Sequence, residues 1–489
     1  MEDDYKKERN NENDQINIIP KQDSRTPFLE DDIPDFSEKS TDEKIQIFVD
    51  QILGGFQYIE TSVQENLVHR KNLVTWLKYF RIFVDNDVAF ENSYDSLIEF
   101  YKQLINNCIE LNLDNKIVHS IVITFNRMIV KVHALITILI DIGLFDMCIK
   151  VLNLGVLRTS QDIYQCLTLI CELSPEHFHF LQKLFSPAVI YDIIIHYNAN
   201  DEETLQYAEY ATMLTKYLYY FCLNCKNMSE DNLTYLGIII QHAYRYEQTW
   251  QKIYVFKTIY LLLENDKIKI NEIGPEYFNI SFSNQFQNYA LSNGLELCKL
   301  MNLMLEKGWD GKEFPYTDIL YFIFTSKAKD STYPIMETLA YALEKIPIEM
   351  KFSFVDNSMR EYSKIILGCC SDIGNGQLNK SFGSMMRMGQ ILVNLYEDFP
   401  EKLMDFYPHS YQALMNLLQI ENIQLQKKTL KLYIFMTQNI LNLNILSLDN
   451  VRAYFEENDG AAIMDSMNEQ EDEEIDVLLD HLHDLLYPE

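Results

Sequence analysis

The chain contains little glycine and little proline. Its 489 residues include 15 Gly and 12 Pro, fewer than half of what average usage would supply. These residues are scattered, and no stretch rich in Pro, Gly and Ser separates two parts of the sequence, so we expect no flexible interdomain linker. A chain of this length exceeds what one compact core accommodates. The scarcity of helix-breaking residues therefore favours long helices stacked in series.

The sequence also lacks a long apolar run. Its most apolar stretch, Ile129 to Ile140, is interrupted by Lys131 and His133 and falls short of the roughly 20 residues that a membrane helix needs. The charged first residues contain no apolar segment of the signal-peptide type. We therefore expect a cytoplasmic protein with no membrane partner. Its 9 cysteines are then expected to be reduced thiols in the core.

Basic residues are outnumbered by acidic ones. The chain has 41 Lys and Arg against 72 Asp and Glu, which gives a formal net charge of -31. Nucleic-acid binding draws most of its affinity from clustered Lys and Arg, so we expect no nucleic acid partner. A basic peptide or basic protein is the better electrostatic match. The alternative is that the acidic excess only keeps a large apolar protein dissolved.

Motifs that carry catalysis or bind cofactors are missing from the sequence. It contains no Gly-x-x-x-x-Gly-Lys-Ser/Thr, no His-Glu-x-x-His and no Gly-x-Ser-x-Gly. Cys222 and Cys225 form a Cys-x-x-Cys without the second pair that a structural zinc site needs. Histidine pairs such as His177 and His179 have no third ligand near them in sequence. We predict that the protein is not an enzyme and that it has no catalytic residues, cofactor or metal site.

Helical periodicity is what the sequence does contain. Residues 1–43 are polar and acidic, which is typical of a disordered tail. From Thr41 onward, beginning with TDEKIQIFVDQIL and its capping Thr or Asp, apolar residues recur at helical spacing and no strand pattern stands out. We predict an all-α protein in which residues 44–489 form a right-handed α-solenoid of roughly ten degenerate armadillo or HEAT-type repeats, least regular at 229–350. Aromatic runs such as Tyr217 to Phe221 are expected to fill the space between helices.

The clearest repeat-like unit extends from Ile140 to Leu181. Its length of about forty residues fits an armadillo or HEAT unit. Gly143 and Gly155 bracket one helix, and a further helix follows with an apolar face that includes Ile163 and Ile170. Each unit of this kind leaves an apolar side that only a neighbouring repeat can cover. The pattern therefore predicts stacking of successive repeats.

Within this unit, the segment LTLICELSPEHFHFL resembles the importin-α branch of the armadillo proteins. In that family the third helix of a repeat runs into an acidic loop with Ser-Pro-Glu before the next helix begins. The segment GQILVNLYEDFPEKLMDF, at Gly389 to Phe406, has the same layout, and FEENDGAAIMDSMNEQEDEEIDVLLDHLHDLLYP at the C-terminus resembles the family's last repeat. The resemblance implies an armadillo fold, a role in nuclear import, and passage between cytoplasm and nucleus.

The resemblance also implies a groove for peptides. In the family, a Trp-x-x-x-Asn ladder on successive third helices clamps the backbone of a nuclear-localisation peptide through Asn, while Trp contacts the stem of a Lys. Carried over to this chain, the ladder positions give the candidate peptide-binding residues Asn126, Gln165, Gln390 and Asn394. No Trp is retained at these positions. The N-terminal tail lacks the basic helix with which members bind importin-β, so an importin-β-like carrier is a partner implied by the resemblance alone.

These patterns predict a protein-binding adapter, importin-α-like, that recognises basic peptides of the nuclear-localisation type on a concave groove. Two alternatives remain open. One is an armadillo or HEAT scaffold in signalling or assembly with no transport role, which predicts no row of polar amides on the inner face. The other is a regulatory subunit of an enzyme, which predicts a pocket with convergent, pKa-shifted residues within 229–350.

Overall fold

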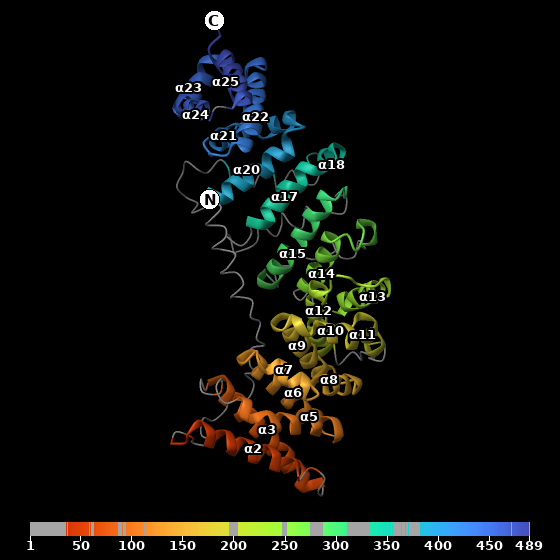
Figure 1. Ribbon diagram of the computed structural model, residues 1–489. Helices are drawn as coiled ribbons and strands as arrows, with labels where there is room; N and C mark the ends of the chain where they lie inside the picture. Colours follow the sequence, from red (N-terminus) through yellow and green to blue (C-terminus); the bar gives the residue numbers. More distant parts are fainter. Residues whose placement is uncertain are drawn as a thin grey trace. The chain divides into compact units, whose positions relative to one another are not determined.

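The described part of the chain is helical in this computed structural model (Figure 1). Apart from positions 37, 112, 354 and 471, the structure describes residues 36–57, 63–86, 94–194, 204–246, 252–273, 287–310, 333–355 and 382–488, together with 59, 90, 363, 367 and 370. Every element assigned in these residues is an α-helix or a short 3-10 helix, which confirms the all-α prediction. Most of the tail predicted at 1–43 lies outside the described residues. No helix in the described ranges combines the length and hydropathy that crossing a bilayer requires.

The chain divides into two compact units, residues 1–150 (unit 1) and residues 151–489 (unit 2). Within unit 1, α3 packs against both α2 and α6, and α5 packs against α2 and α7. The helices of unit 1 are α2 (Thr41–Phe56), α3 (Val63–Asn86), α5 (Ile98–Glu110), α6 (Asn115–Lys131) and α7 (Leu135–Asp141), with a 3-10 helix at Tyr94–Leu97; α8 (Leu144–Asn153) contains the boundary.

The N-cap of helix α2 is Ser40, one residue before the Thr41 or Asp42 that the sequence suggests as its cap. The Ser40 hydroxyl accepts a hydrogen bond from the Glu43 backbone N–H at 3.3 Å. In return, the Glu43 carboxylate accepts one from the Ser40 backbone N–H at 2.8 Å. This capping box satisfies two backbone donors at once, which a lone Thr or Asp cap would not do. The expected cap is therefore corrected to Ser40.

Aromatic side chains form the interior of unit 1 between α2 and α3. The ring of Phe48 lies 5.6 Å from that of Phe80 and 5.3 Å from that of Phe83, measured between centroids. Trp76 meets Phe48 edge-on at 6.1 Å and Tyr79 at 5.7 Å. Rings in such tilted and edge-to-face arrangements bury large apolar areas. This aromatic core joins α2 to α3.

The segment predicted as a repeat-like unit has the expected helix boundaries. Gly143 and Gly155 have φ values of 106° and 70°, in the left-handed region that glycine adopts without a Cβ penalty. Helix α8 lies between them, and α9 (Leu157–Leu173) follows. Ile163 and Ile170 of α9 are fully buried, as their helical spacing predicts. The two glycines therefore end one helix each and allow the chain to turn into the next.

In unit 2, long helices pack in the order in which they occur in the chain (Figure 1). Each of them contacts the next one in the series, and we call them together the row. The row continues through 229–350, where the sequence pattern is least regular. Its members are α9 (Leu157–Leu173), α12 (Thr204–Asn224), α14 (Ile253–Glu264), α15 (Gln287–Glu306), α17 (Tyr333–Lys345), α20 (Phe382–Tyr396), α22 (Ile423–Asn442) and α25 (Glu473–Leu486).

The other helices of unit 2 pack beside members of the row. Helix α13 (Glu230–Tyr246) contacts α11 (Pro187–Ile194) and α12, and α21 (His409–Leu418) contacts α22. Leu339 of α17, Leu392 of α20 and Leu430 of α22 are fully buried, so each row helix contributes to the apolar interior. The remaining elements are α10 (Phe178–Leu184), α18 (Ile348–Ser353), α23 (Leu448–Glu457) and α24 (Gly460–Asn468), with 3-10 helices at Pro175–His177, Ile270–Glu272 and Pro400–Phe406.

Candidate functional site

The row carries a cluster of aromatic and basic side chains that are only partly buried. Helix α12 contributes Lys216, Tyr219 and Tyr220, and the neighbouring α14 contributes Tyr254 and Lys257. The ring centroid of Tyr219 lies 5.9 Å from that of Tyr254 and 5.3 Å from that of Tyr220. We call these residues the tyrosine-lysine face. Because it joins two consecutive helices, it lies along the row and not within one helix.

Helical periodicity separates the tyrosine-lysine face from the core. Tyr217 and Phe221, four residues apart on α12, are fully buried, as the sequence predicts for space-filling aromatics. Tyr219 and Tyr220 lie between them in sequence and are only partly buried. Four aromatic residues in one five-residue stretch exceed what one buried helix stripe can hold. That excess is the signal in the sequence that could have identified Tyr219 and Tyr220 as surface residues.

The two lysines of the face lie over the tyrosine rings. The Lys257 Nζ is 5.6 Å from the ring centroid of Tyr254 and 5.8 Å from that of Tyr219. The Lys216 Nζ is 5.8 Å from the Tyr254 ring. Ammonium groups within about 6 Å of a ring centroid are attracted by the ring quadrupole. The tyrosine rings therefore already bind the ammonium groups of two lysines from the same chain.

Carboxylates lie close enough to the rings to influence their ionisation. Burial, followed by the negative charge of Glu172, raises the pKa of Tyr254 to about 12. Burial likewise raises the pKa of Tyr219, and Glu296 and Glu264 add to that effect. The phenols are therefore neutral at physiological pH. The face then combines neutral aromatic rings with negative charge from α9, α14 and α15, an arrangement that favours a bound cation.

Lys216 has a perturbed environment as well. Burial lowers the pKa of its ammonium group, the positive charge of Lys257 lowers it further, and the carboxylate of Glu172 opposes both effects. Removing an ammonium from water costs free energy that a nearby carboxylate only partly returns. Lys216 is thus held on the face at some cost to folding.

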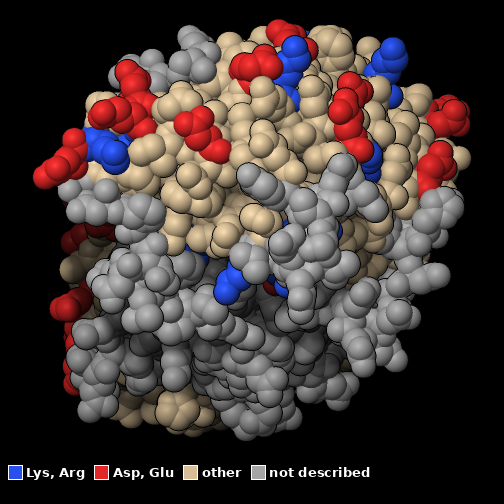
Figure 2. Space-filling model, turned by 90° about the horizontal axis from the view of Figure 1, so that it is seen from below, with Lys and Arg blue, Asp and Glu red and all other residues tan. Residues whose placement is uncertain are grey.

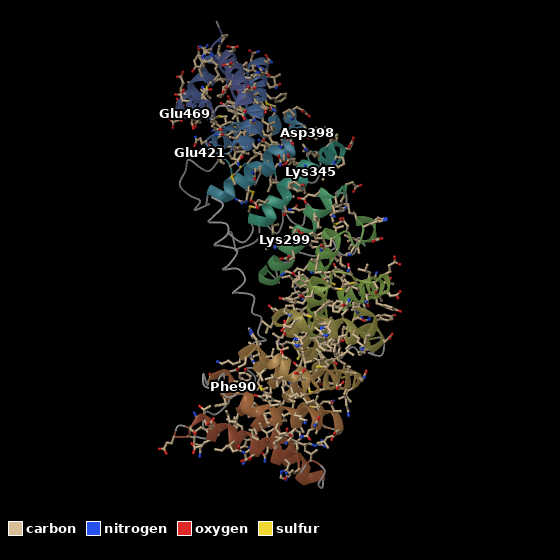
Figure 3. The ribbon with its side chains drawn as sticks, viewed as in Figure 1. Phe90, Lys299, Lys345, Asp398, Glu421 and Glu469 are labelled. Carbon is tan, nitrogen blue, oxygen red and sulfur yellow. The ribbon has the colours of Figure 1, made fainter. Side chains whose placement is uncertain are left out.

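A second charged cluster joins α18, α20 and α22. The Lys351 side chain is only 5% exposed, and its Nζ lies 2.7 Å from Asp398 Oδ2 and 3.2 Å from Glu397 Oε1. The Nζ of Lys428 lies 3.0 Å from Glu397 Oε2 and donates to Asn394 Oδ1 at 2.7 Å. We call these residues the charged seam. Figure 3 labels Asp398 after α20, together with Lys345 at the end of α17 and Lys299 on α15.

A small hollow of about 160 Å³ lies beside the charged seam. Its lysines already have carboxylate partners: the Lys427 Nζ is 2.8 Å from Asp472 Oδ2, and the Lys431 Nζ is 2.7 Å from Glu474 Oε1. The hydrogen bond from Lys427 lowers the pKa of Asp472. Figure 2 presents another face, seen from below the view of Figure 1, which carries both acidic and basic side chains. The hollow is lined by Glu397, Gln424, Lys427, Lys428, Lys431, Leu432 and Glu474.

Two of the four residues predicted to bind a peptide are buried. Asn394 of α20 is 6% exposed; its amide donates to the Ala340 carbonyl of α17 at 2.8 Å while its oxygen accepts from Lys428. Asn126 of α6 is 4% exposed. In the structure, the Asn394 amide therefore ties neighbouring row helices together. A clamping role for either residue stays a prediction.

The other two predicted residues are more accessible. Gln165 on α9 and Gln390 on α20 are partly buried. Gln390 lies one helical turn before Asn394, so the structure brings these two together on α20. Gln165 belongs to a different helix of unit 2, and Asn126 belongs to unit 1. Their roles in peptide binding also stay predictions.

Metal and thiol chemistry finds no support in the described residues. No group of three or more His, Cys, Asp or Glu side chains there could hold a metal ion. Cys222 is buried and Cys225 is partly buried. Burial raises the pKa of both thiols, which disfavours the reactive thiolate form. Cys222 thus packs in the core as predicted.

Comparisons with known proteins give no family for this chain. No protein-family model matches it, and no curated protein matches it. Among solved structures, a crystal structure described as an engineered protein aligns with 89% of this chain and 98% of its own, at 8% sequence identity and a TM-score of 0.44. A likeness at that score carries no argument about function.

Proposed function

We propose that the chain is a protein-binding adapter that holds a lysine-bearing segment of another protein along unit 2. In this proposal the row is a right-handed α-solenoid of armadillo or HEAT type, and the protein is a divergent relative of importin-α. The ligand class that this relationship implies is a basic peptide of the nuclear-localisation type. The adapter has no catalytic step.

The packing of the row supports the solenoid part of the proposal. Helices α9 to α25 of the row contact one another in chain order, which is the quasi-one-dimensional pattern of repeat proteins. The segment from Ile140 to Leu181 has helices at the positions expected for one repeat. A surface that continues across successive helices suits an extended ligand better than a compact one.

The tyrosine-lysine face is the observation that carries the binding part of the proposal. Tyr219 and Tyr254 stand 5.9 Å apart on consecutive helices, and Glu172 and Glu296 act on their hydroxyls. Aromatic rings flanked by carboxylates attract ammonium and guanidinium groups. The net charge of -31 favours the approach of a basic segment over longer distances.

A second candidate function is favoured by the burial of the predicted amides. A scaffold of armadillo or HEAT type without a transport role predicts no exposed amide row, and Asn126 and Asn394 are only 4% and 6% exposed. Such a scaffold would bind a protein partner through other surfaces. It shares the helical architecture with the adapter and differs from it in the ligand.

Peptide titration tests the adapter proposal. The full-length protein is titrated with a fluorescent basic nuclear-localisation peptide at low ionic strength and at about 0.15 M salt. We expect micromolar or tighter binding at low salt that weakens as salt rises. In Tyr219→Ala and Tyr254→Ala we expect affinity to fall by about fivefold or more, because each variant loses a ring worth about 1 kcal/mol to a bound cation.

The matched control is Tyr235→Ala. Tyr235 is a partly buried tyrosine on α13 whose ring is tilted against that of Tyr191, with the centroids 4.9 Å apart, and it is not part of the tyrosine-lysine face. The Tyr235→Ala substitution should leave the affinity for the peptide unchanged. Absence of binding by the wild type at low salt would reject the adapter and leave the scaffold. Equal losses in all three tyrosine variants would place the binding site elsewhere.

A further inference from the structure

Lysines of the chain itself occupy the places where a ligand's ammonium group would be recognised. On the tyrosine-lysine face, Lys216 and Lys257 lie 5.6 to 5.8 Å from the tyrosine ring centroids. These positions are within the distance at which a ring attracts a cation. A lysine from a partner would have to take the same volume. The tyrosine-lysine face is therefore a cation-binding site that is already occupied by two lysines of the chain itself.

The charged seam has the same arrangement with different recognising groups. The Lys428 ammonium donates to Asn394 Oδ1 at 2.7 Å and lies 3.0 Å from Glu397 Oε2 and 3.9 Å from Glu344 Oε1. An amide oxygen and two carboxylates around one ammonium group form a lysine-recognition site. Lys428 is supplied by α22, whereas Asn394 lies on α20 and Glu344 on α17. The recognising groups and their occupant thus come from different row helices.

The folded protein disfavours the ammonium charge of Lys216. Burial lowers the pKa of Lys216, which means that its charged form is disfavoured in the folded protein. Partly buried ions often contribute less to stability than an apolar side chain of similar length. Methionine retains the lysine stem's packing and removes the charge. The positive charge of Lys216 is therefore better explained by the exclusion of a lone foreign ammonium group from the tyrosine-lysine face than by a contribution to stability.

We propose that Lys216, Lys257 and Lys428 are resident occupants of two lysine-recognition sites, and that a lysine-bearing segment binds by displacing them. This inference rests on the proposed function and deepens it. Displacement makes selection stricter, because a single lysine gains nothing by exchanging with a resident one. A segment gains affinity only when several of its lysines replace residents together with further contacts along the row.

Removing the residents should strengthen binding of lysine peptides. The double variant Lys216→Met/Lys257→Met and the single variant Lys428→Met are titrated as full-length proteins with the same basic peptide. We expect each to bind about fivefold tighter than the wild type, since the peptide ammonium no longer competes with a tethered one. A second peptide with its lysines replaced by alanine should show no gain.

The control separates displacement from net charge. Lys183→Met removes one exposed positive charge on α10, outside both sites, and makes the protein more acidic by the same amount as Lys428→Met. If Lys183→Met gains as much affinity as the resident variants, or if the wild type binds and no resident variant binds more tightly, the displacement proposal is wrong while the adapter survives. If neither wild type nor variants bind at low salt, both proposals are wrong.

Discussion

Lys351 is the most deeply buried charged residue of the charged seam. Its Nζ separates the carboxylates of Glu397 and Asp398, which are 26% and 33% exposed. Lys351→Ala leaves two neighbouring carboxylates without their shared cation. We expect the free energy of unfolding to fall by about 2 kcal/mol, less than for a fully buried pair because both carboxylates keep part of their hydration. Urea denaturation followed by circular dichroism measures the loss.

Lys345→Ala is the matched control at the residue scale. Lys345 is exposed at the end of α17, with its Nζ 5.4 Å from the Tyr341 ring. Its removal should change the free energy of unfolding by no more than about 0.5 kcal/mol, as for most surface substitutions. Similar losses in both variants would show that charge number, and not burial of Lys351, determines the effect.

At the scale of single elements, α20 approaches α21 at a glycine. A Cβ built on Gly389 would lie 2.6 Å from Leu417 Cδ2, and Leu417 is fully buried. Gly389→Ala should therefore lower the free energy of unfolding by about 1 kcal/mol, because overpacking outweighs the better helix propensity of alanine. The shift of the urea midpoint in Gly389→Ala measures this loss.

Gly237 provides the opposite case within a helix. It lies in the interior of α13, and a Cβ there would have no neighbouring atom within 4 Å. Gly237→Ala should raise the free energy of unfolding by about 0.5 to 1 kcal/mol through helix propensity alone. A rise of the urea midpoint in both variants would contradict the close approach of α20 and α21, and a fall in both would contradict the open surroundings of Gly237.

At the scale of the whole molecule, the excess of acidic residues opposes folding. A formal net charge of -31 destabilises a compact state through self-repulsion, and salt screens that repulsion. We expect the urea midpoint to rise between low ionic strength and about 0.15 M salt. Potassium chloride is suitable because it screens without specific binding. A falling midpoint would mean that attractive ion pairs such as those of Lys351 outweigh the repulsion.

How much could be predicted from the sequence depends on how far apart the interacting residues are. Apolar spacing within α9 predicted the burial of Ile163 and Ile170, because a helix face is set by residues three and four positions apart. The sequence pattern also predicted that Asn394 lies on a helix, but it did not predict which groups surround its side chain. Its partners, the Ala340 carbonyl and Lys428, lie 54 and 34 residues away. No local pattern encodes such a pairing.

The tyrosine-lysine face was missed for a related reason. Tyr219 and Tyr254 belong to different helices, and their approach depends on how α12 and α14 pack. The sequence alone could assign each tyrosine only to a helix face, and the Trp-x-x-x-Asn ladder that the resemblance implies falls at other positions. Local sequence signals therefore predicted the helices. The tyrosine-lysine face could be identified only once the packing of α12 against α14 was known.

The aromatic core of unit 1 also gives the molecule a built-in optical reporter. Of the 3 tryptophans, Trp76 lies in that core against Phe48 and Tyr79, while Trp250 and Trp309 belong to residues 151–489. In the variant Trp250→Phe/Trp309→Phe, indole emission comes from unit 1 alone, whereas the far-ultraviolet signal comes from the helices of both units. Recording the two signals during one denaturation separates the melting of the first 150 residues from that of the row.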